Sequence, residues 1–290
     1  MKILVSGGTG LLGQGFLRLL RETGEHEVRC FVRRTSPVER LSGLELAYGD
    51  ARDAGSLEQA LRGTDSFVHV AGVQYTPQVL EAMRAARVER LVVVSSTSAH
   101  SRFESRSAPR LTNEALLPES GLCWTVVRPS MIYGSELDHN MNKLLRFLDR
   151  SPVFPLFGSG ENLWQPVYYE DLACGLYAAL MKPEKSEGQT YDLPGLRPLT
   201  YLDLVHTAAG ALGKKTRIVR LPAESVRRVL QVVEGLRLPV PVSSEQVLRL
   251  REDKAYPFGK AREELGYAPR AFKEGIALEV GRLREIGLVS

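Results

Sequence analysis

A glycine-rich turn close to the start of the chain constrains its fold more than any other feature. Ile3–Val5 form a short apolar run that is typical of a buried strand, and Phe16–Leu20 have helical spacing. Between them stand the glycines at positions 7, 8, 10 and 13. Glycine permits a tight turn with positive φ and lets the backbone approach a pyrophosphate at a helix N-terminus. The arrangement predicts a dinucleotide-binding α/β fold, and an ordinary glycine-rich turn is the alternative.

The end of the next strand indicates which dinucleotide is bound. The predicted strand Glu27–Val32 ends in Arg33 and Arg34, where a dinucleotide fold reads the ribose. An acidic residue there would bond the 2′-hydroxyl, whereas guanidinium groups grip a 2′-phosphate. We therefore expect NADP(H) in preference to NAD(H). The alternative is that the two arginines are only solvated charges at the end of a strand. Asp50, after the strand Leu44–Ala47, could accept from the adenine amino group or form a turn.

Apolar runs and helical segments alternate through the first half of the chain. Further apolar runs end at residues 70, 94 and 127, and helical patterns cover 57–61, 77–86 and 112–117. This alternation predicts a Rossmann-type, doubly wound parallel sheet with helices on both faces. Ligands bind such sheets at the carboxyl ends of the strands. The candidate cofactor-binding residues at these ends are Gly7, Thr9, Gly10, Leu11, Leu12, Gly13, Arg33, Arg34, Asp50, Ala51, Ala71, Gly72, Ser95, Pro129 and Ser130.

The pattern changes near residue 134. Prolines and glycines punctuate residues 151–166, and a helix is expected to begin near Asp171, which could cap it. Beyond it we expect helices over 201–212, 222–233, 261–265 and 272–286, and a strand over 218–221. The expected organisation is an NAD(P)-binding Rossmann domain over residues 1–133. A smaller α/β substrate region over 134–290 follows and is partly interleaved with the Rossmann core.

Composition narrows the classes of partner. The 290 residues are 43% apolar and 25% charged, which is typical of a globular protein with a large core. A net charge of +4 without a basic run or tail fits an anionic small ligand and gives no support to a nucleic-acid partner. No apolar run approaches the roughly 18 residues of a membrane span. Because the first strand begins almost at residue 1, we expect no signal peptide. We expect a cytoplasmic protein, with a homodimer possible.

Three cysteines, Cys30, Cys123 and Cys174, are far apart along the chain and flanked by apolar residues. Their odd number and spacing favour buried, reduced thiols over disulfides, metal ligands or nucleophiles. The sequence predicts no metal site.

Several segments stand in the order found in one known family. They are Gly7–Gly13, Val70–Gly72, Val94–Thr97, Arg128–Gly134, Gln165–Ala173 and Leu265–Pro269. The first resembles the cofactor loop of the short-chain dehydrogenase/reductase superfamily, and the fourth is similar to the Arg-Pro-x-x-x-Tyr-Gly element of its extended branch. The chain as a whole resembles epimerase/dehydratase-like members and the NmrA-like, complex I accessory-subunit-like proteins. The resemblance implies a nicotinamide dinucleotide cofactor and oxidoreductase chemistry.

The chain departs from the family at the residues that carry its chemistry. The family uses a Tyr-x-x-x-Lys pair on the helix after the fifth strand, and the matching positions here are Arg106 and Arg110. Arginine, with a pKa above roughly 12, cannot act as a general acid near neutrality, although Arg110 could hold a ribose or a phosphate. Thr97 matches the substrate-orienting hydroxyl residue. Tyr133 and His100 are candidate proton donors. The alternatives are that Tyr133 is only a packed tyrosine and that His100 is an ordinary polar residue of the loop.

Three functions follow from these residues. The first is an NADP(H)-dependent reductase of a carbonyl-type small molecule with a non-standard catalytic site, for which Thr97, Tyr133 and Arg110 are the candidates. The second is a non-catalytic NADP(H)-binding sensor, regulator or scaffold, favoured by the loss of the Tyr and Lys pair. The third is a nucleotide-sugar epimerase or dehydratase, which normally needs the missing tyrosine.

Overall fold

The computed structural model of the protein describes residues 1–222 and 252–290, which fall into two compact units. Unit 1 comprises Met1–Ile132, Val167–Pro194 and Pro257–Pro269. Unit 2 comprises Tyr133–Pro166, Gly195–Tyr256 and Arg270–Ser290. The helix expected over residues 222–233 lies, beyond its first residue, outside the described residues.

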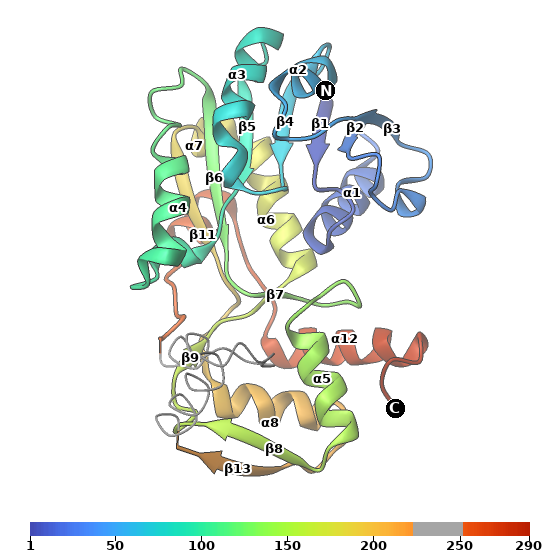
Figure 1. Ribbon diagram of the computed structural model, residues 1–290, viewed down its shortest axis with the longest axis vertical. Coiled ribbons are helices and arrows are strands. Elements are labelled where there is room, and N and C mark those ends of the chain that lie inside the picture. The colour runs from blue at the N-terminus through green and yellow to red at the C-terminus, as the bar shows by residue number, and fades with distance from the viewer. Residues whose placement is uncertain (223–251) are drawn as a thin grey trace, which may run out of the picture. The chain divides into compact units, whose positions relative to one another are not determined.

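A seven-stranded sheet forms the centre of unit 1 (Figure 1), in the order β11-β6-β5-β4-β1-β2-β3. All neighbouring strands in it run parallel. Its strands are β1 (Lys2–Ser6), β2 (Glu27–Val32), β3 (Glu45–Tyr48), β4 (Ser66–His69), β5 (Arg90–Val94), β6 (Cys123–Pro129) and β11 (Gln189–Leu193). The arrangement confirms the expected Rossmann-type α/β fold.

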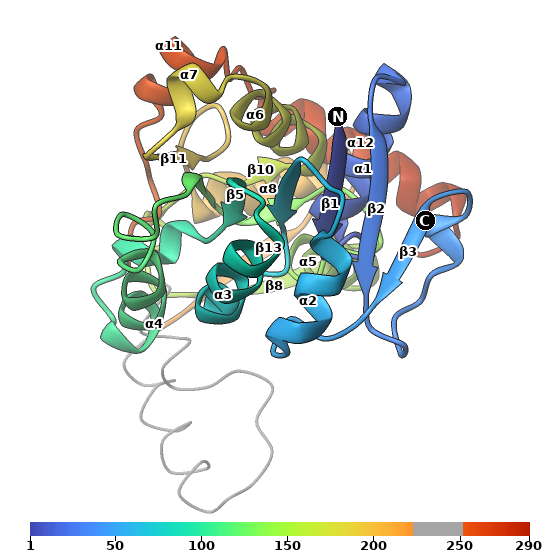
Figure 2. The ribbon, with the colours of Figure 1, turned by 90° about the horizontal axis from the view of Figure 1, so that it is seen from above.

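Helices cover both faces of this sheet. They are α1 (Leu11–Thr23), α2 (Ala54–Leu61), α3 (Thr76–Ala86), α4 (Glu104–Glu114), α6 (Tyr169–Met181), α7 (Pro183–Ser186) and α11 (Gly259–Leu265), with the 3-10 turns η1 (Glu39–Leu41), η2 (Val73–Tyr75) and η3 (Thr97–His100). Figure 2 shows α2 and α3 on one face and α6 on the other. Ile3, Leu4 and Val5 in β1, an inner strand of the sheet, are therefore fully buried. Each such side chain contributes about 1.5–3 kcal/mol of burial free energy.

The turn between β1 and α1 depends on glycine. Gly7 has a φ of 71°, which side-chain-bearing residues rarely adopt. A Cβ atom at Gly13 would overlap the carbonyl oxygen of Gly7 and lie 2.7 Å from Gly8 Cα. The first turn of α1 therefore packs directly against the chain that leaves β1.

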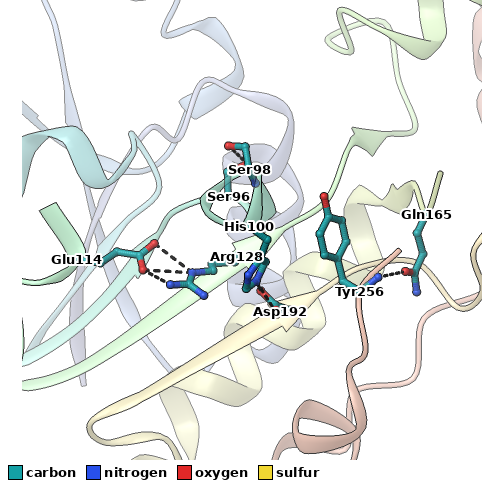
Figure 3. Close-up of polar contacts among 8 residues, drawn as sticks. All are labelled: Ser96, Ser98, His100, Glu114, Arg128, Gln165, Asp192 and Tyr256. Atoms are coloured by element: carbon teal, nitrogen blue, oxygen red, sulfur yellow. Dashed lines mark hydrogen bonds and ion pairs between the residues drawn. The ribbon is translucent and has the colours of Figure 1, made fainter. Parts of the chain in front are cut away.

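Unit 2 contains α5 (Met141–Arg150), α8 (Tyr201–Ala211) and α12 (Phe272–Glu285), and both α5 and α12 pack against α8. Its strands pair in twos: β13 (Arg217–Leu221) parallel to β8 (Val153–Phe157), and β12 (Leu199–Thr200) antiparallel to β9 (Leu163–Trp164). The chain also contains a pair of short strands, β7 (Ile132–Tyr133) and β10 (Val167–Tyr168), the second of which belongs to unit 1. The buried Gln165 side chain accepts from the Tyr256 N–H at 2.7 Å and donates to the Gly195 carbonyl at 2.8 Å (Figure 3). It thereby joins the segments Tyr133–Pro166 and Gly195–Tyr256 of unit 2.

Three local expectations are wrong. The helix expected over 112–117 is α4, which begins at Glu104 and ends at Glu114 with Pro109 inside it. Asp171 does not cap α6, because Tyr168 occupies the capping position and Asp171 lies in the first turn. Of the three cysteines expected to be buried, Cys30 is buried, Cys123 is half-buried, and Cys174 is exposed because it lies on the outer side of α6. All three cysteines are free thiols.

Candidate functional site

A cavity of about 300 Å³ lies in unit 1 at the carboxyl ends of β1, β2 and β3. It is lined by Ser6, Gly7, Gly8, Thr9, Phe31, Val32, Arg33, Ser36, Gly49, Asp50, Ala51, Arg52, Ala71 and Tyr75. Six of these residues are among the candidate cofactor-binding residues: Gly7, Thr9, Arg33, Asp50, Ala51 and Ala71. The structure brings them together because parallel strands end at one edge of the sheet.

The other candidate cofactor-binding residues stand outside the lining of this cavity, and cofactor binding by either group stays a prediction. They are Gly10, Leu11, Leu12, Gly13, Arg34, Gly72, Ser95, Arg110, Pro129 and Ser130. The first four form the N-terminus of α1. Gly10 is its N-cap, with no side-chain cap bond and no acidic residue in the first turn. An N-terminus of this kind presents backbone N–H groups and a positive dipole end, which suit the negative charge of a pyrophosphate.

The two arginines after β2 occupy different surroundings. Arg33 lines the cavity, and its carbonyl accepts from the Ser36 N–H at 3.0 Å, which turns the chain at the rim. Arg34 instead places its guanidinium over the Tyr48 ring, with 5.7 Å between the guanidinium carbon and the ring centroid. Of these two arginines, only Arg33 therefore lines the cavity.

Asp50 carries the acidic group of the cavity, and Arg52 binds it through both carboxylate oxygens. Arg52 Nε donates to Oδ1 at 2.9 Å, and Nη2 donates to Oδ2 at 2.7 Å. The Arg52 guanidinium holds the pKa of Asp50 well below its usual range, and the Arg52 backbone N–H and the charge of Arg33 add to this. Asp50 is thus ionised, and its charge is balanced by a neighbour that sequence reasoning missed. Arg52 lies two residues after Asp50 in the sequence, and this spacing could have identified it.

His69 is a buried residue behind the cavity. Its Nε2 lies 3.1 Å from the Gly72 carbonyl and its Nδ1 lies 2.7 Å from Ser6 Oγ. Because a carbonyl can only accept, Nε2 carries the proton and Nδ1 accepts from the serine. Burial lowers the pKa of His69 to about 4, so the ring is neutral at physiological pH. Its edge-on contact with Tyr75, at 6.0 Å between centroids, means that one neutral ring positions two lining residues, Ser6 and Tyr75.

A second group of polar side chains follows β5. Thr97, 4% exposed, begins η3. Ser96 Oγ accepts from the Ser98 N–H at 3.2 Å and lies 3.1 Å from Ser98 Oγ. His100 ends η3, and its Nε2 lies 3.0 Å from each carboxylate oxygen of Asp192 on β11 (Figure 3). Asp192 was missed because β11 was not expected as a strand.

Helix α4 carries the two arginines that replace the family's tyrosine and lysine. Arg106 is exposed, whereas Arg110 is half-buried and donates from Nη1 to the Arg106 carbonyl at 2.8 Å. Burial lowers the pKa of Arg110, and the charge of Arg106 lowers it further. The C-terminal end of α4 is fixed by Glu114, which accepts from Arg128 Nε at 3.1 and 3.2 Å and from Arg128 Nη2. This largely buried ion pair ties α4 to β6 (Figure 3).

Tyr133 belongs to unit 2 and is 1% exposed. Its hydroxyl donates to the Phe272 carbonyl at 3.5 Å, and its ring makes an edge contact with the Phe272 ring. Its role in catalysis stays a prediction.

Within residues 1–222 and 252–290, no group of three or more His, Cys, Asp or Glu side chains could hold a metal ion. No helix of the same residues has both the length and the apolar character needed to cross a membrane.

The chain is similar to several proteins whose names refer to nicotinamide dinucleotides or to reductases. Residues 7–145 match a family model described as NAD(P)H-binding. An NAD(P)H azoreductase from Xenophilus azovorans is 27% identical, with 82% of each chain covered. A 2-alkyl-3-oxoalkanoate reductase from Stenotrophomonas maltophilia is 26% identical, with 95% of this chain and 97% of that one covered. Subunit 9 of the NADH dehydrogenase [ubiquinone] 1 alpha subcomplex from Arabidopsis thaliana is 25% identical, with 87% and 68% covered.

The same fold is found in solved structures. A nucleoside-diphosphate-sugar epimerase from Pseudomonas aeruginosa superposes with a TM-score of 0.81 at 22% identity, covering 100% of this chain and 99% of that one. Residues 7–145 therefore match an NAD(P)H-binding domain, and the chain has the fold of this epimerase. These findings agree with the resemblance of its motifs to the extended branch of the short-chain dehydrogenase/reductase superfamily.

Proposed function

We propose that the protein is an NADP(H)-dependent reductase of a carbonyl-type small molecule. The observation that carries the cofactor preference is Arg33 on the cavity wall, beside an Asp50 carboxylate already bound by Arg52. A free acidic residue at this edge would repel a 2′-phosphate, whereas the pairing leaves Arg33 to attract one. Reductase names among the relatives, at 26–27% identity, support the reaction class.

The residues fit the parts of a nicotinamide dinucleotide. The turn after β1 and the N-terminus of α1 suit the pyrophosphate, and the cavity behind Arg33 and Asp50 suits the adenosine end. Further along the same edge, Ser95 follows β5, Pro129 ends β6 and Ser130 follows it. These three residues are our candidates for holding the nicotinamide end. When bound, the cofactor supplies a hydride. Thr97 is our candidate for orienting the substrate carbonyl through its hydroxyl.

The two arginines after β2 provide a matched test of the cofactor preference. We expect Arg33→Ala to weaken NADPH binding about tenfold or more, because a charged hydrogen-bonding partner is lost, and to leave NADH binding unchanged. Arg34→Ala should change NADPH binding much less, because that guanidinium packs on Tyr48. Fluorescence titration of both variants with both cofactors measures this. Equal binding of NADH and NADPH by the unmodified protein would contradict the proposal.

A second function is favoured by one specific observation. The helix position that carries the family's catalytic tyrosine holds the exposed Arg106, and a protein without a proton donor would bind NADP(H) as a sensor or a scaffold. Absorbance at the nicotinamide band with a panel of carbonyl compounds separates the two functions. Consumption of bound NADPH supports the reductase, whereas tight binding without consumption across the panel supports the sensor.

A further inference from the structure

We infer that Arg52 sets the preference of the cavity for NADPH over NADH by occupying the Asp50 carboxylate, so that Arg33 stays available for the 2′-phosphate. The inference rests on the proposed NADP(H) preference and deepens it, because the preference then depends on a residue other than the one that would bind the phosphate. Arg33, Asp50 and Arg52 all line the same cavity. Arg52 is thus a positioning residue, which acts on the cofactor through Asp50.

The Asp50 carboxylate has two basic neighbours, and Arg52 holds it. Arg52 donates to Oδ1 from its backbone N–H and from Nε, both at 2.9 Å, and to Oδ2 from Nη2 at 2.7 Å. Arg33 is near enough for its charge to lower the pKa of Asp50 as well. Among the residues that the structure describes, no hydrogen bond or ion pair engages the Arg33 guanidinium. Arg52 therefore occupies a carboxylate with which Arg33 could itself pair.

The backbone around Asp50 does not depend on this ion pair. Ser56 Oγ accepts from the Asp50 N–H at 3.2 Å, and Asp53 caps α2 by accepting from the Gly55 N–H at 3.1 Å. The Arg52 side chain is 75% exposed, and ion pairs at exposed positions contribute little to folding stability. Loss of the Arg52 side chain should therefore change the charges of the cavity and leave its shape.

Removal of Arg52 would change which groups meet the phosphate. The lining of the cavity carries two arginines and one aspartate, so it would keep one of each. The freed carboxylate would repel a 2′-phosphate, and it would attract the Arg33 guanidinium away from that phosphate. A 2′-hydroxyl is spared both effects, since it is uncharged and can donate to a carboxylate. The change therefore acts on NADPH binding and leaves NADH binding as it is.

The test measures the Kd of NADPH and the Kd of NADH by fluorescence titration. We expect Arg52→Ala to weaken NADPH binding about tenfold, the effect of one lost charged contact, and to keep the Kd of NADH within about twofold. Asp50→Asn alone should keep the preference for NADPH. The double variant Asp50→Asn/Arg52→Ala should regain that preference, because no carboxylate is left to compete for Arg33.

A second arginine near the cavity provides the matched control. Arg62 forms an exposed ion pair with Glu58 at 2.8 Å and does not belong to the lining of the cavity. Arg62→Ala should therefore leave both Kd values unchanged. Circular dichroism checks that each variant is folded. If Arg52→Ala is not, Arg52→Met replaces it, because methionine keeps most of the side chain without the charge.

The outcomes separate the inference from the proposed preference. If the double variant binds NADPH as weakly as Arg52→Ala does, Arg52 holds the phosphate itself and the inference is overturned. The inference is also overturned if Arg52→Ala binds NADPH as tightly as the unmodified protein. In both cases the proposed preference for NADPH stands. If the unmodified protein binds NADPH and NADH equally, the preference and the inference both fall.

Discussion

Glu279 on α12 is a carboxylic acid that the fold of unit 2 buries completely. Burial and the nearby Asp138 raise the pKa of Glu279 to about 9. Asp138 accepts from the backbone N–H groups of Asn140 at 2.7 Å and Asn142 at 2.9 Å. These bonds favour the negative charge on Asp138, so Glu279 is the member of the pair that stays protonated.

This protonation makes stability depend on pH in a defined direction. Between pH 4.5 and about 9 the folded chain holds a proton on Glu279 that an unfolded chain releases, so the free energy of unfolding falls as pH rises through that window. Within this window, each rise of one pH unit lowers the free energy of unfolding by at most about 1.4 kcal/mol. We expect Glu279→Gln to remove this dependence and to be more stable than the unmodified protein at pH 8.

Urea unfolding at several pH values between 5 and 9 measures the effect. Glu274→Gln, at an exposed position on the same helix, is the control and should follow the unmodified protein. Parallel curves for the unmodified protein and Glu279→Gln would show that Glu279 is already ionised in the fold.

At the residue scale, the cofactor cavity was more accessible to sequence reasoning than the polar group after β5. Gly7 and Arg33 line the cavity because each follows a strand, and strand ends can be recognised from apolar runs. Tyr75 and Arg52 lie further into their turns, where no sequence pattern indicates which way their side chains point. The distinction between Arg33 and Arg34 depends on the neighbouring Tyr48, which only folding brings near.

At the element scale, the turn from β1 into α1 offers two glycines whose substitution should affect stability differently. A side chain at Gly13 would overlap the backbone of Gly7, so Gly13→Ala should lower the free energy of unfolding by about 1–3 kcal/mol and abolish NADPH binding. At Gly10 the nearest atom to an added Cβ is Gly7 O at 3.5 Å, an ordinary contact. Gly10→Ala should therefore fold with near-normal stability and weaken NADPH binding, because the methyl group obstructs the pyrophosphate.

Thermal unfolding and fluorescence titration of the two variants check this pair of expectations. Equal loss of stability in both would mean that the turn tolerates no side chain at all. Tight NADPH binding by Gly10→Ala would instead place the pyrophosphate away from this turn.

The elements that sequence reasoning missed share one cause. β11 reads Gln-Thr-Tyr-Asp-Leu and lies at the edge of the sheet, so it lacks the apolar run that marks the buried strands. α4 buries only Ser107 and Glu114, and a proline stands inside it, so neither apolar periodicity nor propensity indicates its bounds. β8 contains Pro155 and forms a two-stranded pair, in a stretch where prolines and glycines predicted loops. In each case tertiary contacts decide the structure.

At the scale of the whole molecule, cofactor binding should stabilise the protein through the part that holds the cavity. A ligand at 100 times its Kd adds about 2.7 kcal/mol to the free energy of unfolding, which corresponds to a rise of roughly 5–10 °C in Tm for a chain of this size. We expect NADPH to give this rise and NADH a smaller one at equal concentration. Hydrogen exchange should show protection by NADPH in the turns after β1, β2 and β3, where the cavity lies.

Arg33→Ala is the control for this measurement, and it should remove most of the difference between the two cofactors. An unchanged Tm with both cofactors would contradict the assignment of the cavity as a dinucleotide site.

The order of the strands has a consequence for how such a protein diverges. The cavity lies at β1, β2 and β3, on one side of the sheet, whereas His100 and Asp192 belong to the side formed by β5, β6 and β11. Substitutions can therefore change the side chains on one side of the sheet while those on the other side are kept. We therefore expect related chains to vary more in the side chains after β5, β6 and β11 than in the lining of the cavity.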